Sequence, residues 1–173
     1  DEVLPYEERD SYAVVFGGYP KKKRLYESLT PKRVQQLQSV GVSQIIDVGS
    51  PGAAPDSVFG LTVNERGVLP AAKISEWLQR SRVGLLSYPA DYLTKSGIWG
   101  AYAAHGVYPL LDSPKRQCKL LQSEHHFSYL SDEKAIQRVK SNSSEKSLFQ
   151  WYQKTASSYR SAILFLELLE GLQ

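Results

Sequence analysis

Short apolar runs and amphipathic stretches alternate along the chain up to Asp112. Five short, mainly apolar runs predict buried strands, at residues 12–16, 42–48, 58–63, 83–87 and 107–111. Three stretches between them have the spacing of amphipathic helices, at residues 30–41, 70–80 and 96–105. Strands made of continuous apolar residues are typical of a sheet that is covered on both faces. The pattern therefore predicts an α/β fold, a Rossmann-like parallel sheet of about five or six strands with helices on both faces.

The pattern weakens after Asp112, where the chain is polar and basic up to residue 147. A short strand is predicted at residues 126–130 and a short helix at residues 132–140. A long C-terminal helix follows, with an apolar stripe that packs it back onto the core, made of Leu148, Trp151, Tyr159, Ile163, Leu166 and Leu169. We therefore predict a single domain over residues 1–173, with a Rossmann-like core at 12–112 and a helical C-terminal part at 113–173.

Composition narrows the class of protein. Hydrophobic residues make up 42% and charged residues 23% of the 173 positions, which is typical of a globular domain rather than a disordered chain. The single cysteine, Cys118, excludes an internal disulfide and a multi-cysteine metal site. No apolar run approaches the roughly 20 residues of a membrane-spanning helix, and the first residues lack the pattern of a signal peptide. We expect a cytoplasmic domain with no metal, no cofactor and no transmembrane segment.

Positive charge is concentrated after the first predicted strand. The chain as a whole carries +3, whereas residues 21–33 hold six basic residues and one glutamate. Parallel sheets bind ligands beyond the carboxyl ends of their strands, so this loop predicts a phosphate-binding segment. A solvated surface run is the alternative. Nucleic acid is not expected as a partner, because one short run does not make an extended basic face.

Two further loops follow predicted strands. Lys95-Ser96-Gly97 opens a helix, where free backbone N–H groups, a hydroxyl, the helix dipole and a lysine converge on an anion. The alternative is a plain serine N-cap without a ligand. Gly67-Val68-Leu69 could offer backbone groups to a flat ring, or could simply turn the chain. None of these segments supplies a catalytic residue.

The order of these motifs is similar to that of a known family. It consists of Gly67-Val68-Leu69, the strand Val83-Gly84-Leu85-Leu86, the helix start Lys95-Ser96-Gly97, and the helix end Ala103-Ala104-His105-Gly106-Val107. This order resembles the C-terminal, donor-binding lobe of GT-B fold glycosyltransferases, over residues 12–112. Many retaining members carry two glutamates eight positions apart, and the second of them binds the donor ribose. The matching positions here are Leu93 and Ala101, so both carboxylates are absent.

The resemblance implies a function for the chain. It would be the nucleotide-sugar-binding domain of a hexosyltransferase, which transfers a sugar from a nucleotide diphosphate sugar to an acceptor hydroxyl. The donor diphosphate would lie against Gly18, Lys22, Lys23, Arg24, Lys95, Ser96 and Gly97, with Lys21 as a further candidate cation. The base and ribose would lie against Gly67, Val68 and Leu69.

Two expectations about partners follow from the resemblance. A separate N-terminal lobe would bind the acceptor, so this chain alone is expected to be inactive. The alternative is a non-catalytic Rossmann-like module that binds a nucleotide or a protein partner without turnover.

Overall fold

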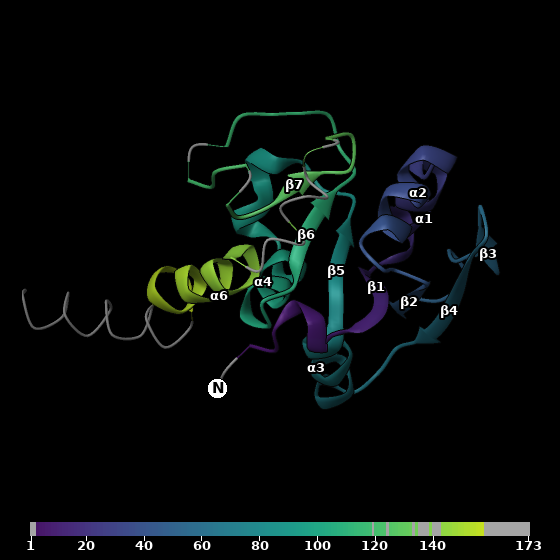
Figure 1. Cartoon of the computed structure of the whole chain (residues 1–173), viewed down its shortest axis with the longest axis horizontal. Coiled ribbons are helices and arrows are strands. Elements are labelled where there is room, and N and C mark those ends of the chain that lie inside the picture. The colour runs from purple at the N-terminus through teal and green to yellow at the C-terminus, as the bar shows by residue number, and fades with distance from the viewer. Residues whose placement is uncertain are drawn as a thin grey trace, which may run out of the picture.

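The computed structural model describes residues 3–118, 120–123, 125–132, 134, 139 and 143–157. Within them, one seven-stranded sheet has the order β3-β4-β2-β1-β5-β6-β7 (Figure 1). The strands are β1 (Asp10–Gly17), β2 (Gln44–Gly49), β3 (Ser57–Val58), β4 (Leu61–Gly67), β5 (Ser81–Leu86), β6 (Tyr108–Leu111) and β7 (Ser128–Tyr129). All neighbouring strands are parallel except β3 and β4, which form an antiparallel hairpin at one edge. The predicted parallel α/β sheet is confirmed.

Helices cover both faces of the sheet (Figure 1). They are α1 (Tyr19–Ser28), α2 (Pro31–Ser39), α3 (Ala71–Arg80), α4 (Gly97–Ala104) and α6 (Ser143–Thr155), with short 3-10 turns η1 (Tyr6–Glu8) and η2 (Ala90–Lys95). Side chains of β1 alternate between two apolar cores. Ala13 and Val15 pack with α1 and α2, whereas Tyr12 and Val14 pack with α3, α4 and α6. Because both faces of β1 are covered, residues 12–16 form an unbroken apolar run.

Two predicted segments differ from the structure. The basic segment after β1 was predicted as a loop and is the helix α1, whose buried face includes Lys22, Leu25, Tyr26 and Leu29 at helical spacing. A lysine within that buried stripe obscured the apolar pattern. The predicted strand at 58–63 is a hairpin instead, because the chain turns at Phe59-Gly60 with positive φ angles of 45° and 87°.

The C-terminal part is described only in places. β7 lies within the predicted strand at 126–130, and α6 is described up to Thr155. Leu148 is buried, and the ring of Trp151 lies 5.6 Å from that of Trp99 in an edge-to-face pair. These contacts fasten α6 onto α4. The remaining four positions of the predicted stripe, and six of the nine positions of the predicted helix at 132–140, lie outside the described residues. No described helix has the length and apolarity that a bilayer span requires.

Candidate functional site

The strand order reverses between β1 and β5, because the connections from these two strands run to opposite sides of the sheet. From β1 the chain crosses through α1 and α2 to β2, and from β5 it crosses through α4 on the other face to β6. In open parallel sheets, ligands bind at such a switch point, beyond the carboxyl ends of the strands. The last paired residues of the two strands are Val15 and Leu85. Beyond them the strands separate.

One side chain of α4 occupies the point of separation. The hydroxyl of Tyr102 accepts a hydrogen bond from the backbone N–H of Phe16 at 3.2 Å and lies 3.1 Å from the carbonyl oxygen of Leu85, to which it donates. Burial raises the pKa of this hydroxyl. Tyr102 therefore remains a neutral donor and acceptor that holds α4 against the ends of β1 and β5.

Two helices begin at this edge of the sheet. α1 starts after Gly18 and has no side-chain cap, whereas α4 starts after Ser96, whose Oγ accepts the N–H of Trp99 at 3.2 Å. An added Cβ on Gly18 or Gly97 would meet no described atom within 4 Å, so the space in front of both helix starts is open. The two starts are neighbours, because a Cβ on Gly17 would lie 3.0 Å from Cδ1 of Ile98. The first-turn N–H groups of both helices lack intrahelical acceptors.

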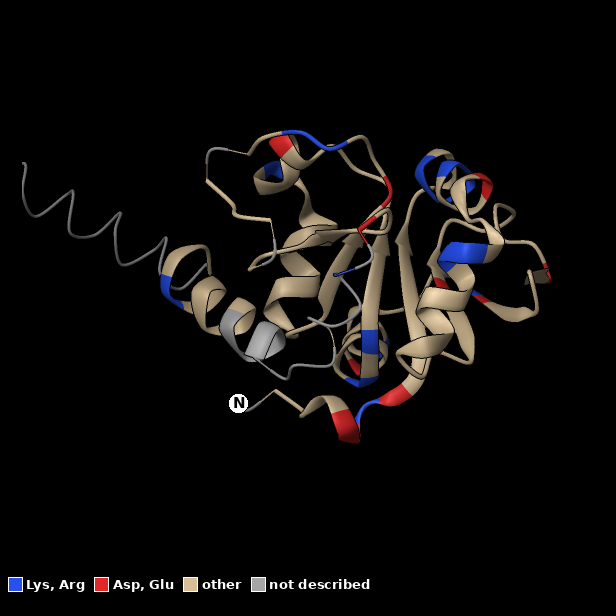
Figure 2. Cartoon of the chain, turned by 45° about the horizontal axis from the view of Figure 1, so that its top comes forward, with Lys and Arg blue, Asp and Glu red and all other residues tan. Residues whose placement is uncertain are grey.

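Lys and Arg positions recur along α1 and at the start of α2 (Figure 2), but the side chains lie in different surroundings. Lys22 is 1% exposed and forms an ion pair with Asp47 in the interior. Tyr26 also donates to Asp47, at 2.6 Å. Burial raises the pKa of the Asp47 carboxyl, and the hydrogen bonds from Lys22 and Tyr26 oppose that shift. Lys22, predicted as a diphosphate ligand, is therefore placed under the helix and away from the open edge.

Lys21 lies on the side of α1 that faces β5. Its Nζ sits 3.9 Å from the centroid of the Tyr88 ring, in the loop that follows β5. Lys95 sits 5.5 Å over the ring of Tyr92, on the 3-10 turn that precedes α4. The sequence alone does not show which of the basic residues after β1 faces the loop after β5. That depends on which side of α1 packs on the sheet and on the position of Tyr88, and both are set by the fold.

Lys23 and Arg24 occupy the outer face of α1. Both are exposed, and Lys23 lies 3.9 Å from Glu27 one turn along the helix. Arg33, at the start of α2, is held by the carboxylate of Asp112 at 2.9 Å. These groups contribute positive charge to this part of the molecule without a described contact to the start of α4.

Gly67-Val68-Leu69 lies at the end of β4, on the far side of β2 from β1. Gly67 ends the strand with a positive φ of 66°, and Val68 is 78% exposed. The segment therefore shares the carboxyl edge of the sheet with the starts of α1 and α4. No described contact joins it to Lys21 or Gly97. Within the described ranges, no group of three or more His, Cys, Asp or Glu residues could hold a metal ion.

Comparison with known proteins identifies similar structures. No family model and no curated protein sequence matches the chain. A sucrose-phosphate synthase from Thermosynechococcus elongatus has 16% identity and a TM-score of 0.61, over 98% of this chain and 46% of that chain. The pneumococcal O-GlcNAc transferase GtfA, in complex with UDP and GlcNAc, has 13% identity and a TM-score of 0.46, over 94% of this chain and 33% of that chain.

The chain thus spans less than half the length of each of these structures. The match extends over nearly the whole chain, including the parallel sheet and its covering helices. The chain has the fold of one lobe of a GT-B glycosyltransferase.

Proposed function

We propose that this chain is the nucleotide-sugar-binding lobe of a glycosyltransferase, which transfers a sugar from a nucleotide diphosphate sugar to an acceptor hydroxyl. The observation that carries the proposal is the meeting of two open helix starts, at Gly18 and Gly97, at the switch point of the sheet. The fold is similar to that of a sucrose-phosphate synthase, by its name an enzyme that forms sucrose phosphate.

The diphosphate would lie between the starts of α1 and α4. The first-turn N–H groups of both helices and the positive ends of their dipoles favour an anion there. Lys21 and Lys95 now rest over Tyr88 and Tyr92. At an exposed site a cation–π contact stabilises by about 0.5–1 kcal/mol, whereas a charge-assisted hydrogen bond stabilises by about 1.5–3 kcal/mol. Both lysines would therefore leave the rings for a phosphate, and Lys21 replaces Lys22 in the site predicted from the sequence.

The base and ribose would lie along the same edge, over Gly67-Val68-Leu69. The exposed side chain of Val68 offers an apolar surface to a flat base. Leu93 is fully buried and Ala101 is half-buried in the core on the α4 side. Ribose recognition would therefore use backbone groups rather than carboxylates at these two positions.

In the transfer step, the bond between the anomeric carbon and the phosphate oxygen breaks, and the acceptor oxygen forms the new bond. The acceptor proton passes to a base, and the electron pair of the broken bond stays on the leaving nucleoside diphosphate. The helix starts and the two lysines would stabilise that developing charge, which is the role of fixed dipoles in group transfer. A second lobe would supply the acceptor site and the base.

The second candidate is a nucleotide-binding module without turnover. The apolar residues at Leu93 and Ala101 favour it, because the family's donor-gripping carboxylates are absent there. Both functions predict binding of a nucleotide at the same edge, and only the first predicts that a sugar attached to the diphosphate adds affinity.

Calorimetric titration with UDP, ADP and GDP, and with their glucose conjugates, tests the site. Gly97→Val, Lys21→Ala and Lys95→Ala should each weaken nucleotide binding by about ten- to a hundredfold, through blocked approach or a lost charge-assisted hydrogen bond. Lys23→Ala is the matched control, with the same loss of charge on the outer face of α1, and should change affinity by less than about threefold. Unchanged affinity in both Gly97→Val and Lys21→Ala would place the ligand elsewhere.

A further inference from the structure

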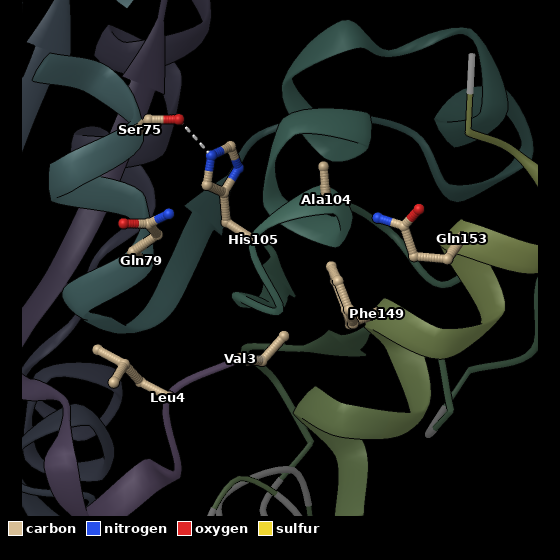
Figure 3. A pocket seen from close by; sticks show the side chains of 8 residues that line it. All are labelled: Val3, Leu4, Ser75, Gln79, Ala104, His105, Phe149 and Gln153. Atoms are coloured by element: carbon tan, nitrogen blue, oxygen red, sulfur yellow. Dashed lines mark hydrogen bonds between the residues drawn. The ribbon is translucent and has the colours of Figure 1, made fainter. Parts of the chain in front are cut away.

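A cavity of about 750 Å³ lies at the end of α4 opposite to the candidate diphosphate site. α4 runs from Gly97, at the carboxyl edge of the sheet, to Ala104, and the cavity is lined by Ala104 and the following His105. The other walls come from α3, α6 and the N-terminal residues Val3 and Leu4 (Figure 3). Small-molecule cavities measure roughly 300–1,000 Å³, so the space suits a ligand of that class.

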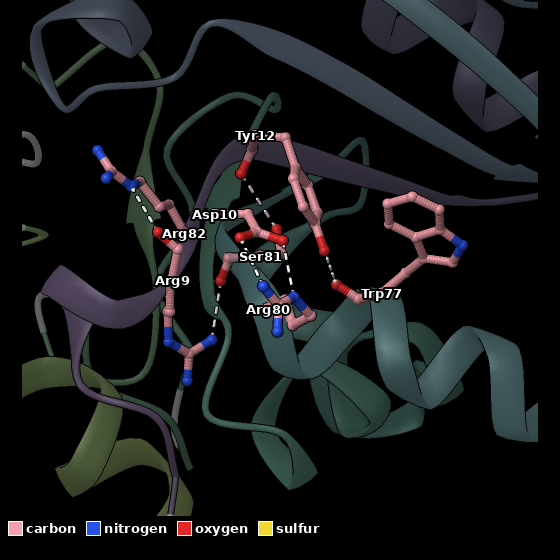
Figure 4. Close-up of polar contacts among 7 residues, drawn as sticks. All are labelled: Arg9, Asp10, Tyr12, Trp77, Arg80, Ser81 and Arg82. Atoms are coloured by element: carbon pink, nitrogen blue, oxygen red, sulfur yellow. Dashed lines mark hydrogen bonds and ion pairs between the residues drawn. The ribbon is translucent and has the colours of Figure 1, made fainter.

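One buried arginine holds two of the cavity walls. Arg9 is 2% exposed, and its guanidinium donates to the backbone carbonyls of Leu4 at 3.0 Å and His105 at 3.2 Å. It also donates to the backbone carbonyl of Ser81 at 2.8 Å (Figure 4). These bonds tie the N-terminal wall, the end of α4 and the start of β5 to a single rigid group. The N-terminal wall and the wall at the end of α4 are therefore fixed relative to each other before any ligand arrives.

The polar lining comes from three helices or their ends. Ser75 and Gln79 lie on α3, His105 follows α4, and Gln153 lies on α6 (Figure 3). None of the described lining residues is Lys, Arg, Asp or Glu. A phosphate or carboxylate would find no opposite charge here, so the lining favours an uncharged ligand.

The hydrogen-bonding capacity of the lining is only partly used. Nδ1 of His105 donates to the Ala101 carbonyl at 2.7 Å, and Nε2 forms a hydrogen bond with the Ser75 hydroxyl at 2.5 Å. The Ser75 oxygen keeps a free lone pair. Among the described residues, the side-chain amides of Gln79 and Gln153 have no hydrogen-bond partner, and each offers two donors and an acceptor.

We propose that this cavity binds an uncharged saccharide of one or two rings. The hydroxyls of a sugar both donate and accept hydrogen bonds, as the side-chain amides of Gln79 and Gln153 do. Sugar hydroxyls project from all sides of the ring, and the polar groups of the cavity likewise come from several of its walls. Phe149 adds one aromatic ring for the apolar face of a sugar. A nucleobase would need its hydrogen-bonding groups in one plane and cover on both faces, whereas the described lining holds a single aromatic carbocycle. The proposal does not depend on the diphosphate site.

Titration of the chain with maltose and sucrose, followed by saturation-transfer NMR or calorimetry, tests the proposal. Gln79→Leu and Gln153→Leu should each weaken binding of the better sugar by about three- to tenfold, the effect of one neutral hydrogen bond. Both residues are exposed, so neither variant disturbs the core. Gln38→Leu, at an exposed position on α2, is the matched control and should leave the affinity unchanged.

The titration is repeated with saturating UDP, which should not compete because the two sites occupy opposite ends of α4. Millimolar binding that responds to Gln79→Leu and Gln153→Leu but not to Gln38→Leu or UDP supports a saccharide site. Absence of binding, an equal effect of Gln38→Leu, competition by UDP, or tighter binding of uridine or adenosine at the cavity would each overturn it.

Discussion

Tyr102 places one hydroxyl between β1 and β5, where the two strands stop pairing, and its ring lies on Gly84 of β5. An added Cβ on Gly84 would lie 2.5 Å from Cε2 of Tyr102, which is closer than two carbon atoms tolerate. Gly84→Ala is therefore expected to lower the free energy of unfolding by about 1–3 kcal/mol, through displacement of the ring and of its hydrogen bonds. Urea unfolding followed by circular dichroism measures the change.

Gly100→Ala provides the comparison within α4. Its Cβ would enter open space, and alanine is the better helix former by about 0.5–1 kcal/mol, so this variant should be more stable than the parent chain. Equal effects of the two substitutions would show that the Tyr102 ring does not constrain Gly84.

His126 makes the stability of the chain depend on pH. Burial lowers the pKa of its ring below the ordinary value of 6.5, and Nδ1 accepts the backbone N–H of Gln122 at 2.9 Å. Below the ordinary value the unfolded chain binds this proton more readily than the folded chain. The free energy of unfolding should therefore fall as the pH drops through 6.5 toward the lowered pKa, with a slope of at most about 1.4 kcal/mol per pH unit.

Urea midpoints between about pH 8 and about pH 5 measure this slope. His126→Gln should flatten the profile, because the titrating group is removed. His125→Gln, at the adjacent exposed position, should change the profile much less, because the charge of His125 contributes less than burial to the lowered pKa of His126. A profile that His126→Gln does not change would assign the pH dependence to another group.

At the scale of the element, two neighbouring residues at the start of α4 are expected to have different roles, Ser96 in stability and Gly97 in binding. The Ser96 hydroxyl is occupied by the N–H of Trp99, whereas Gly97 borders open space. Ser96→Ala is expected to lower the free energy of unfolding by about 1 kcal/mol, the usual effect of a lost N-cap. Ser39→Ala, at the exposed end of α2, should change it by less than about 0.5 kcal/mol.

The same Ser96→Ala variant should bind nucleotide more tightly than Gly97→Val does, because the hydroxyl already has a partner in the fold. Thermal unfolding and calorimetric titration of one preparation give both quantities. A loss of affinity in Ser96→Ala as large as that in Gly97→Val would mean that the hydroxyl contacts the ligand directly.

At the scale of the whole molecule, the fold of the chain matches 46% of the length of a sucrose-phosphate synthase. The proposed function places the acceptor site and the base in a second lobe. We therefore expect the 173-residue chain to bind a nucleoside diphosphate and to transfer no sugar. Release of UDP, ADP or GDP from the glucose conjugates, in the presence of simple sugar acceptors, measures transfer. Turnover that Lys95→Ala abolishes would show that this chain carries its own acceptor site and base.

The limits of sequence reasoning are clearest at α1. Apolar periodicity located β1 and β2 on either side of it but not the helix itself, because Lys22 interrupts the buried stripe with a charge. That charge is tolerated only because Asp47, in β2, lies beneath it. The residues of α1 do not indicate that Asp47 is the partner of Lys22. The segment was therefore predicted as a loop, and Lys22 as a residue that binds the diphosphate.

Local pattern alone was enough for the parallel α/β class, the main strands and the helix starts at Thr30 and Ser96. Strand burial and N-capping depend on residues within a few positions of one another, so both can be recognised in the amino-acid sequence alone. The order of the strands and the direction of each lysine required the tertiary structure. They depend on contacts between distant residues, such as Lys22 with Asp47 across 25 positions and Phe16 with Tyr102 across 86, which form only when the whole sheet is assembled.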